Sequence, residues 1–107
     1  PFGNDREFHK AIDIATKYGK VVMAPADGIV TEAAYQQDVG QMIQIDHGHG
    51  ISTFYGHLSK AIVRTGATVR KGDKIGYVGS TGRSTGSHLH YAVMLNGVPV
   101  NPRKYLN

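Results

Sequence analysis

The sequence predicts an all-β domain, a compact antiparallel sheet built from hairpins and glycine-rich turns. Helical periodicity is nearly absent, because even the best helical candidate, residues 5–19, fits an alternation of apolar residues at least as well. Several other runs are rich in β-branched and aromatic residues and are bounded by turn residues. The chain also carries 14 glycines and 4 prolines among its 107 residues, which is typical of a fold with many tight turns. This length predicts a single domain with a core of its own.

The first half of the chain is predicted to contain a strand, a strand–turn–strand unit and a hairpin. The apolar residues of the stretch 5–19 fall on alternate positions, as in a half-buried strand. Residues 20–34 contain a strand, a Pro-Ala-Asp-Gly turn and a second strand. Residues 41–58 predict a hairpin whose turn lies in the glycine-rich stretch 46–50.

The second half is predicted to contain short strands followed by another hairpin. Residues 64–86 contain a glycine every few positions, which predicts short strands separated by turns. In residues 91–100 the pair Asn96-Gly97 separates two apolar runs. An Asn-Gly pair in this setting is the strongest short-range signal for a two-residue hairpin turn.

Charge and composition exclude several classes of function. The net charge is +4 and the basic residues are scattered, with neither a recognition helix nor an aromatic–basic sheet signature, so no nucleic-acid partner is expected. The absence of cysteine excludes disulfides and thiolate metal sites. No apolar run approaches the ~18 residues of a membrane-spanning helix. The six histidines are more informative, because each can bind a metal or transfer a proton near neutral pH.

Residues 86–93, with the sequence GSHLHYAV, place two histidines in a stretch that otherwise has the composition of a strand. His88 and His90 are two positions apart, so in a strand both lie on one face and the odd-numbered residues lie on the other. The pair therefore predicts either an exposed polar face or a metal or catalytic site.

Three further residues could act with that pair. His9 and Asp13 are four positions apart, which places them on one face of a strand and equally on one face of a helix. His57 is predicted to end a strand and, by alternation, to lie on the same face of it as Thr53 and Tyr55. If these residues lie close to the histidine pair in the fold, imidazole and carboxylate groups are gathered in one place.

An aspartate, a neighbouring histidine and an HxH pair supply the donor atoms of a zinc site. Catalytic zinc is bound by three protein ligands and keeps a fourth position for water, and without thiolates the ligands must be histidine and carboxylate. The chain has no HExxH motif, and its two glutamates, Glu7 and Glu32, lie in no recognisable site. A histidine is therefore the expected proton carrier, since its pKa suits that role.

Four stretches of the chain form a recognisable set: HKAID (9–13), FYGHLS (54–59), a long glycine-rich run ending in STGSHLHY (69–91), and NGVPVNP (96–102). In sequence and order they resemble the lysostaphin-like, or LytM-type, zinc metallopeptidases, which cleave peptide bonds in bacterial peptidoglycan. The resemblance covers almost the whole chain, and STGSHLH is its most specific part.

This resemblance implies a site and an activity. Zn²⁺ would be bound by His9, Asp13 and His90, while His57 and His88 would be the catalytic pair that acts as base and stabilises the transition state. The implied function is that of a zinc-dependent endopeptidase, which hydrolyses peptide bonds in the stem peptides or cross-bridges of peptidoglycan. The implied scaffold is an all-β domain of the lysostaphin-like fold with a groove across the sheet.

The resemblance also implies the setting in which the domain works. Residues 1–107 are expected to form a single catalytic domain of a longer exported protein, which acts in the periplasm, at the cell wall or as a secreted enzyme. The expected partner is the peptide portion of peptidoglycan, and the domain is expected to be a monomer with no nucleic-acid partner and no membrane span within this chain.

Two other functions fit parts of the sequence. A catalytically silent LytM-type module that activates a cell-wall amidase would keep the fold, but the complete set of five site residues argues against it. A lipoyl or biotinyl carrier is suggested by VRKGDKIG (69–76), yet Lys71 and Lys74 do not have the small or methionine neighbours that such a lysine has.

Four aromatic or histidine residues have structural interpretations instead. His47 and His49 form a second HxH, but their glycine neighbours predict a tight turn in which the imidazoles bond to the backbone. Tyr55 and Tyr91 are predicted to be packing residues, with donation to an oxyanion as the alternative.

Overall fold

The computed structural model describes residues 11–15, 17–81 and 88–100, with side chains for residues 17–81 and 89–100. These ranges contain nine strands and no helix, which confirms the all-β prediction. The strands are β1 (Ala11–Ala15), β2 (Val21–Met23), β3 (Gly28–Gln36), β4 (Gly40–Gly48), β5 (Ile51–Ala61), β6 (Thr68–Val69), β7 (Lys74–Val78), β8 (His88–Leu95) and β9 (Val98–Val100). No helix long and apolar enough to cross a membrane is found in this described part of the chain.

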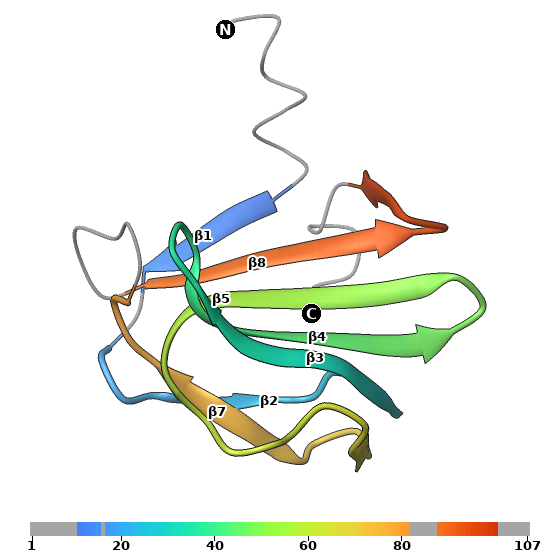
Figure 1. Cartoon of the computed structure of the whole chain (residues 1–107), viewed down its shortest axis with the longest axis horizontal. Coiled ribbons are helices and arrows are strands. Elements are labelled where there is room, and N and C mark those ends of the chain that lie inside the picture. The colour runs from blue at the N-terminus through green and yellow to red at the C-terminus, as the bar shows by residue number, and fades with distance from the viewer. Residues whose placement is uncertain (1–10, 16, 82–87, 101–107) are drawn as a thin grey trace, which may run out of the picture.

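The strands form one curled antiparallel sheet with a branch (Figure 1). The main order is β1-β8-β5-β4-β3-β6, and β9 pairs with the outer end of β8. Strand β5 is the branch point, because residues 51–56 pair with β8 and residues 58–61 pair with β7. Strand β7 in turn pairs with β2, so these two strands lie apart from the main run of strands, at the bottom of Figure 1.

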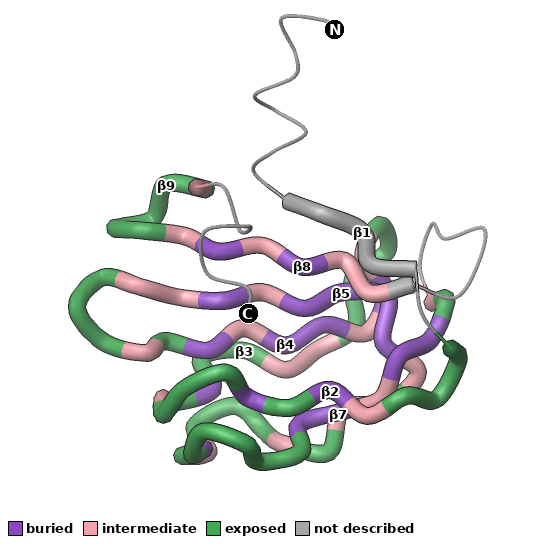
Figure 2. The backbone as a smooth tube through the Cα atoms, turned by 180° about the vertical axis from the view of Figure 1, so that it is seen from behind, coloured by how far each residue is buried: buried purple, intermediate pink, exposed green. Residues whose placement is uncertain are grey.

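The hydrophobic core lies inside the curl. Buried residues alternate with less buried ones along much of β4, β5 and β8, as Figure 2 shows. The inward residues of these strands, such as Ile43, Tyr55 and Val93, join Val22 of β2 and Ile75 of β7 in one cluster. The opposite face of β4, β5 and β8 is called the open face below.

Two predicted hairpin turns are confirmed at the residue level. His49 and Gly50 join β4 to β5 with φ of 53° and 79°, and Asn96 and Gly97 join β8 to β9 with φ of 53° and 80°. Positive φ at both central residues is the signature of a type I′ turn, which matches the twist of antiparallel strands. The predicted Pro-Ala-Asp-Gly turn also separates two strands, but they do not pair with each other, since β2 pairs with β7 and β3 pairs with β4 and β6.

Candidate active site

His90 lies on the open face of β8, at the centre of a row of positions that crosses the sheet. Tyr91 and Val93 are buried in the core and Leu89 packs against it, which leaves the half-buried His90 on the other face, as the alternation predicts. Antiparallel pairing places Asp13 of β1 opposite His90 on one side and Gly56 of β5 opposite it on the other. The sheet thus brings a carboxylate position directly beside an imidazole position.

The predicted zinc ligands are only partly within the described residues. His9 lies outside them, and the side chains of Asp13 and His88 are not described either, although both backbones are. Among the residues whose side chains are described, no three His, Cys, Asp or Glu gather into a metal-binding group. The register of Asp13 against His90 fits a nitrogen–oxygen ligand pair, and the complete ligand set stays a prediction.

His57 does not have the position that sequence parity predicts. It lies within β5 rather than at its end. Gln41 pairs with Leu58 while Ile43 pairs with Tyr55, so β5 has one more residue than β4 between these two pairs. At this bulge His57 has a φ of 60° and donates its backbone N–H to the carbonyl of Val39 at 2.6 Å. The extra residue reverses the alternation, since the core position after Tyr55 is taken by Leu58.

The bulge turns the His57 ring toward His90. The ring centroids are 5.7 Å apart, and the ring planes are inclined by 76°. His57 is nevertheless buried, with an exposed fraction of 7%. These two predicted site residues, one on β5 and one on β8 with β6 and β7 between them in sequence, are therefore neighbours in space.

A hydrogen bond determines which nitrogen of His57 carries the proton. Nδ1 lies 2.7 Å from the backbone carbonyl oxygen of Thr81. A carbonyl can only accept, so Nδ1 is the donor and Nε2 is the basic nitrogen of the neutral ring. His57 is thus held in the tautomer that a general base at Nε2 requires.

Gly56 and Phe54 also contribute to the surroundings of His90. A Cβ on Gly56 would lie 3.4 Å from Cβ of His90 and 3.3 Å from the Phe54 ring, so this position leaves room where the two histidines approach. The Phe54 ring meets His90 edge to face, with centroids 5.9 Å apart. These contacts limit the orientations available to the His90 ring.

In the second HxH, His47 has the predicted structural role, although it lies in β4 rather than in a turn. His47 Nδ1 donates to the carbonyl of Asp27 at 2.9 Å, and its Nε2 lies 2.7 Å from the hydroxyl of Thr53. That hydroxyl therefore donates to Nε2, and the Tyr55 hydroxyl, 2.7 Å away, donates to Thr53. His49 occupies the β4–β5 turn and is exposed. Both nitrogens of His47 are thus engaged by protein groups.

Tyr55 and Tyr91 face the core rather than the site. They are register partners with exposed fractions of 2% and 4%, and their rings are 5.5 Å apart. Burial raises the pKa of Tyr55, while its bond to Thr53 acts in the opposite direction and the charge of Tyr91 raises it further. Burial also raises the pKa of Tyr91. Both are packing residues, which favours the first of the two predicted roles.

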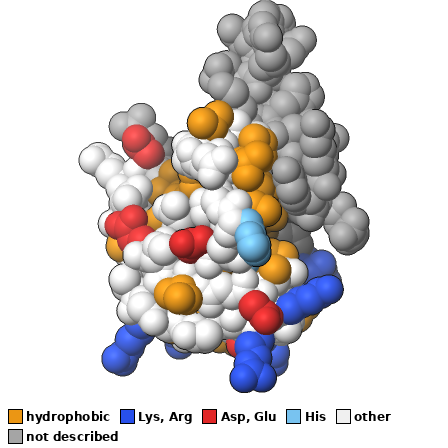
Figure 3. Space-filling view, turned by 90° about the vertical axis from the view of Figure 1, so that its right-hand side faces the viewer, with side chains coloured by type: hydrophobic (Ala, Val, Ile, Leu, Met, Phe, Trp, Pro, Cys, Tyr) orange, Lys and Arg blue, Asp and Glu red, His pale blue; other side chains and the backbone are white. Residues whose placement is uncertain are grey.

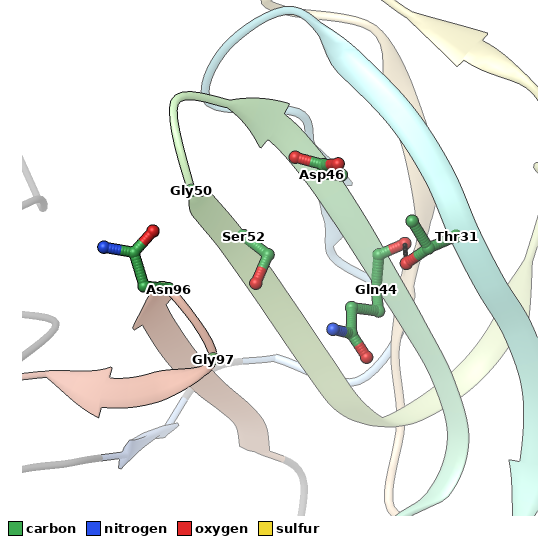
Figure 4. Close-up of a pocket in the computed structure, with 7 residues that line it drawn as sticks. All are labelled: Thr31, Gln44, Asp46, Gly50, Ser52, Asn96 and Gly97. Atoms are coloured by element: carbon green, nitrogen blue, oxygen red, sulfur yellow. Dashed lines mark hydrogen bonds between the residues drawn. The ribbon is translucent and has the colours of Figure 1, made fainter.

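The open face is hollowed at the end that carries the type I′ turns (Figure 4). Mostly polar residues from three strands and two turns line this hollow: Thr31, Gln44, Asp46, Gly50, Ser52, Asn96 and Gly97. Seen from that end, the surface is largely uncharged, with acidic groups near its middle and Lys and Arg at its lower rim (Figure 3). Ser52 and Phe54 share the open face of β5 with Gly56, so the hollow and the His57–His90 pair lie on the same face of the sheet.

Sequence reasoning missed one residue of this site. Thr81 belongs to the stretch GSTG, which has the composition of a turn and no spacing relation to His57. Only the pairing of β7 with the second half of β5 brings it next to His57.

Comparison with known proteins identifies the family. The family model described as Peptidase family M23 matches residues 7–102, nearly the whole chain. The chain belongs to peptidase family M23. The match spans all the predicted site residues, and it confirms the resemblance on which their roles were based.

Two relatives of the M23 chain illustrate the similarity in sequence. It is 48% identical over 94 residues, 88% of its length, to the DD-carboxypeptidase/endopeptidase Mpg of Neisseria meningitidis serogroup B. It is 40% identical over 95 residues, 89% of its length, to the peptidoglycan DD-endopeptidase ShyC of Vibrio cholerae. The chain spans only 22% of the length of each of these relatives.

Two solved structures share the fold of the M23 chain. A zinc-containing peptidase from Vibrio cholerae has a TM-score of 0.83 at 38% identity, over 87% of this chain and 29% of that one. The catalytic domain of the antimicrobial peptidase lysostaphin from Staphylococcus simulans has a TM-score of 0.85 at 32% identity, over 98% of this chain and 84% of that one. The lysostaphin-like fold predicted from the sequence is thereby confirmed.

Proposed function

We propose that this M23 domain is a zinc-dependent endopeptidase that hydrolyses peptide bonds in the stem peptides or cross-bridges of bacterial peptidoglycan. The observation that supports it most is the buried His57, whose ring meets that of His90 while Asp13 lies opposite His90 in the register. Names of relatives support the substrate and the metal, since ShyC is a peptidoglycan DD-endopeptidase and a structural neighbour is a zinc-containing peptidase.

The proposed ligands are His9, Asp13 and His90. Histidine nitrogens with one carboxylate oxygen are the donor set of hydrolytic zinc sites. A zinc ion bound there would polarise the scissile carbonyl and lower the pKa of the attacking water. The proton transfers and the stabilisation of the oxyanion would be carried out by side chains of this chain.

His57 and His88 are the proposed catalytic pair. With Nδ1 bonded to Thr81, His57 would accept or return a proton at Nε2, which is the basic nitrogen of the neutral ring. His88 lies two positions from His90 on β8, at the strand's first residue, opposite Ala15. Together the two imidazoles would share the roles of base, stabiliser of the oxyanion and proton donor to the leaving amine.

The setting proposed for this activity is outside the cytoplasm. Peptidoglycan lies in the periplasm or at the cell wall, so an enzyme with this substrate must act there. We further propose that the domain works as a monomer and as part of a longer protein, in keeping with the larger relatives that it matches.

Two variants and one control test this proposal with purified peptidoglycan. His57→Gln should lower the rate of peptide release by at least about 100-fold while leaving the zinc content unchanged, because general acid–base catalysis contributes roughly 10²–10⁴-fold. His90→Ala should lose both zinc and hydrolysis. The control, Tyr35→Phe, changes an exposed residue of β3 and should do neither. Zinc is measured by elemental analysis and cleavage by mass spectrometry of the released ends.

The same experiment distinguishes the silent amidase activator. Such a module would release no peptide from peptidoglycan in the wild-type form, and it would raise the activity of a cell-wall amidase instead. Wild-type turnover that survives in both His57→Gln and His90→Ala would reject the proposed site.

A further inference from the structure

Thr81 makes three hydrogen bonds around the bulge of β5. Its backbone carbonyl accepts from His57 Nδ1 at 2.7 Å. Its hydroxyl donates to the carbonyl of Leu58 at 2.6 Å and accepts from the backbone N–H of Gln41 at 3.0 Å. Thr81, three residues after the end of β7, thus bonds to β4, to β5 and to the proposed catalytic imidazole.

The hydroxyl bonds of Thr81 fix the position of its carbonyl. Gln41 and Leu58 are register partners, so the hydroxyl bridges a donor and an acceptor that face each other across β4 and β5. Both are backbone groups of paired strands, which are among the most rigid parts of a fold. A side chain bound at two such points leaves its own residue little freedom to rotate.

His57 needs such support because its backbone is in an uncommon conformation. A φ of 60° is rare for residues other than glycine and persists where surrounding contacts determine it. The backbone N–H is engaged by Val39 and the ring nitrogen by Thr81, so the main chain and the side chain of His57 are each held by a hydrogen bond to another segment. The carbonyl of Thr81 can accept only from a protonated Nδ1, and it therefore selects the tautomer as well as the orientation.

We infer that Thr81 is a positioning residue for His57: its hydroxyl holds its own carbonyl where that carbonyl fixes the ring of His57 in the Nδ1-protonated tautomer. The catalytic meaning of this arrangement rests on the proposed function, in which Nε2 of His57 takes part in proton transfer. The positioning itself does not depend on that function and can be measured without any substrate.

Nitrogen NMR of the wild-type protein gives the first test. With imidazole nitrogens labelled, and with His57→Gln used to assign the signals, neutral His57 should show a protonated Nδ1 and an unprotonated Nε2. A neutral ring protonated at Nε2 would overturn the inference, whatever the activity of the protein.

Substitutions at Thr81 give the second test. Thr81→Val removes the hydroxyl at nearly constant size, and it should produce a mixture of the two His57 tautomers. With a soluble cross-linked peptide dimer as substrate, kcat should fall about 10- to 100-fold while KM changes little, because a small misplacement of a catalytic group costs rate rather than binding. Thr81→Ser restores the hydroxyl and should return both the tautomer and kcat to near the wild-type values. Thr81→Ala repeats the test with a smaller side chain if the valine disturbs folding.

A matched control comes from the neighbouring strand position. Ser59 also donates its hydroxyl to a backbone carbonyl, that of Tyr77 at 3.3 Å, but it does not hold Thr81. Ser59→Ala should leave the His57 tautomer and kcat unchanged. Unchanged tautomer and kcat in both Thr81→Val and Thr81→Ala would overturn the inference.

The outcomes separate this inference from the proposed function. A wild-type protein without zinc or without peptide release would reject the proposed function, yet the tautomer measurements would still decide the role of Thr81. Conversely, if the protein is an active zinc enzyme but its His57 tautomer is unchanged by substitution of Thr81, the proposed function stands and the positioning role is rejected.

Discussion

At the residue scale, the structure separates histidines that look alike in the sequence. His47 and His90 each belong to an HxH and each lie in a strand, but His47 has Asp27 and Thr53 on its two nitrogens, whereas His90 lies opposite Asp13 in the register. What distinguishes them is the residues that the sheet places beside each histidine, and the spacing of the motif carries no information about that.

His47 is expected to contribute to stability and not to metal binding. In His47→Ala the O–H of Thr53, a residue that is 4% exposed, loses its acceptor, and a buried donor left without an acceptor costs about 1–3 kcal/mol. Urea denaturation should show this loss, and elemental analysis should show wild-type zinc content. The control His49→Asn changes an exposed turn position to a residue that tolerates positive φ, so it should alter neither quantity. A fall in zinc content in His47→Ala would instead make His47 a ligand.

Tyr55 offers a test of its assignment to the core. Tyr55→Phe removes one hydrogen bond to Thr53 and should lower the free energy of unfolding by about 1 kcal/mol. The rate of peptide release should stay at the wild-type value, because the hydroxyl points away from the open face. A large fall in that rate without loss of stability would support the oxyanion role that the burial of Tyr55 argues against.

At the element scale, β5 positions the site through its bulge. Its first half pairs with β8 and brings Gly56 beside His90, and its second half pairs with β7 and brings Thr81 beside His57. The one extra residue at Gly56–His57 allows a single strand to do both. It turns the side chain of His57 out of the core, and the side chain of Leu58 is the one buried in the core. A regular strand would bury a residue at position 57 against the core.

Gly79 holds the segment after β7 close to β5. A Cβ at this position would lie 2.4 Å from the backbone nitrogen of Ser59 and 2.7 Å from its Cα, and backbone atoms cannot move aside cheaply. Gly79→Ala should therefore destabilise the protein by about 1–3 kcal/mol, as overpacking typically does. Because Thr81 follows two residues later, the variant should also disturb the His57 tautomer. The control Ser80→Ala alters an exposed neighbour and should be close to wild type in urea denaturation and in the NMR signals of His57.

At the scale of the whole molecule, the buried tyrosine hydroxyls predict how stability changes at high pH. Burial raises the pKa of Tyr55 above its ordinary value of 10.0. Below pH 10 both the folded and the unfolded chain keep this proton, so its contribution is constant. As the pH rises above about 10, the unfolded chain releases the proton while the folded chain keeps it. The free energy of unfolding then falls by up to about 1.4 kcal/mol per pH unit for this group.

Urea denaturation at several values between pH 8 and pH 11.5 measures this effect. The wild-type protein should lose stability steeply above pH 10, and Tyr55→Phe should show a shallower fall because the ionisable group is gone. Tyr35→Phe, which removes an exposed tyrosine, should follow the wild-type slope. Equal slopes for Tyr55→Phe and the wild type would mean that Tyr55 is ionised as easily in the folded chain as in the unfolded one.

The sequence by itself determined the all-β class, the places of two hairpin turns and the family. Alternation of apolar residues and the Asn-Gly pair act locally, through strand geometry and positive φ, so they are readable from neighbouring residues. It also singled out His57 and His90, which the structure brings together, and correctly placed Tyr91 and Val93 on the opposite face of β8. His9, Asp13 and His88 are the other residues of the predicted site, and their roles stay predictions, because their side chains are not among those described.

Only the tertiary structure decided the bulge in β5, the tautomer of His57 and the part played by Thr81. Each depends on contacts between residues that are distant in sequence: the register of β4 against β5 creates the extra residue, and the pairing of β7 with β5 delivers the carbonyl of Thr81. Parity within one strand cannot reveal a bulge, because a bulge is a mismatch between two strands. Hydrogen-bond partners across a sheet are likewise set by how the strands assemble, which no single segment of the chain specifies.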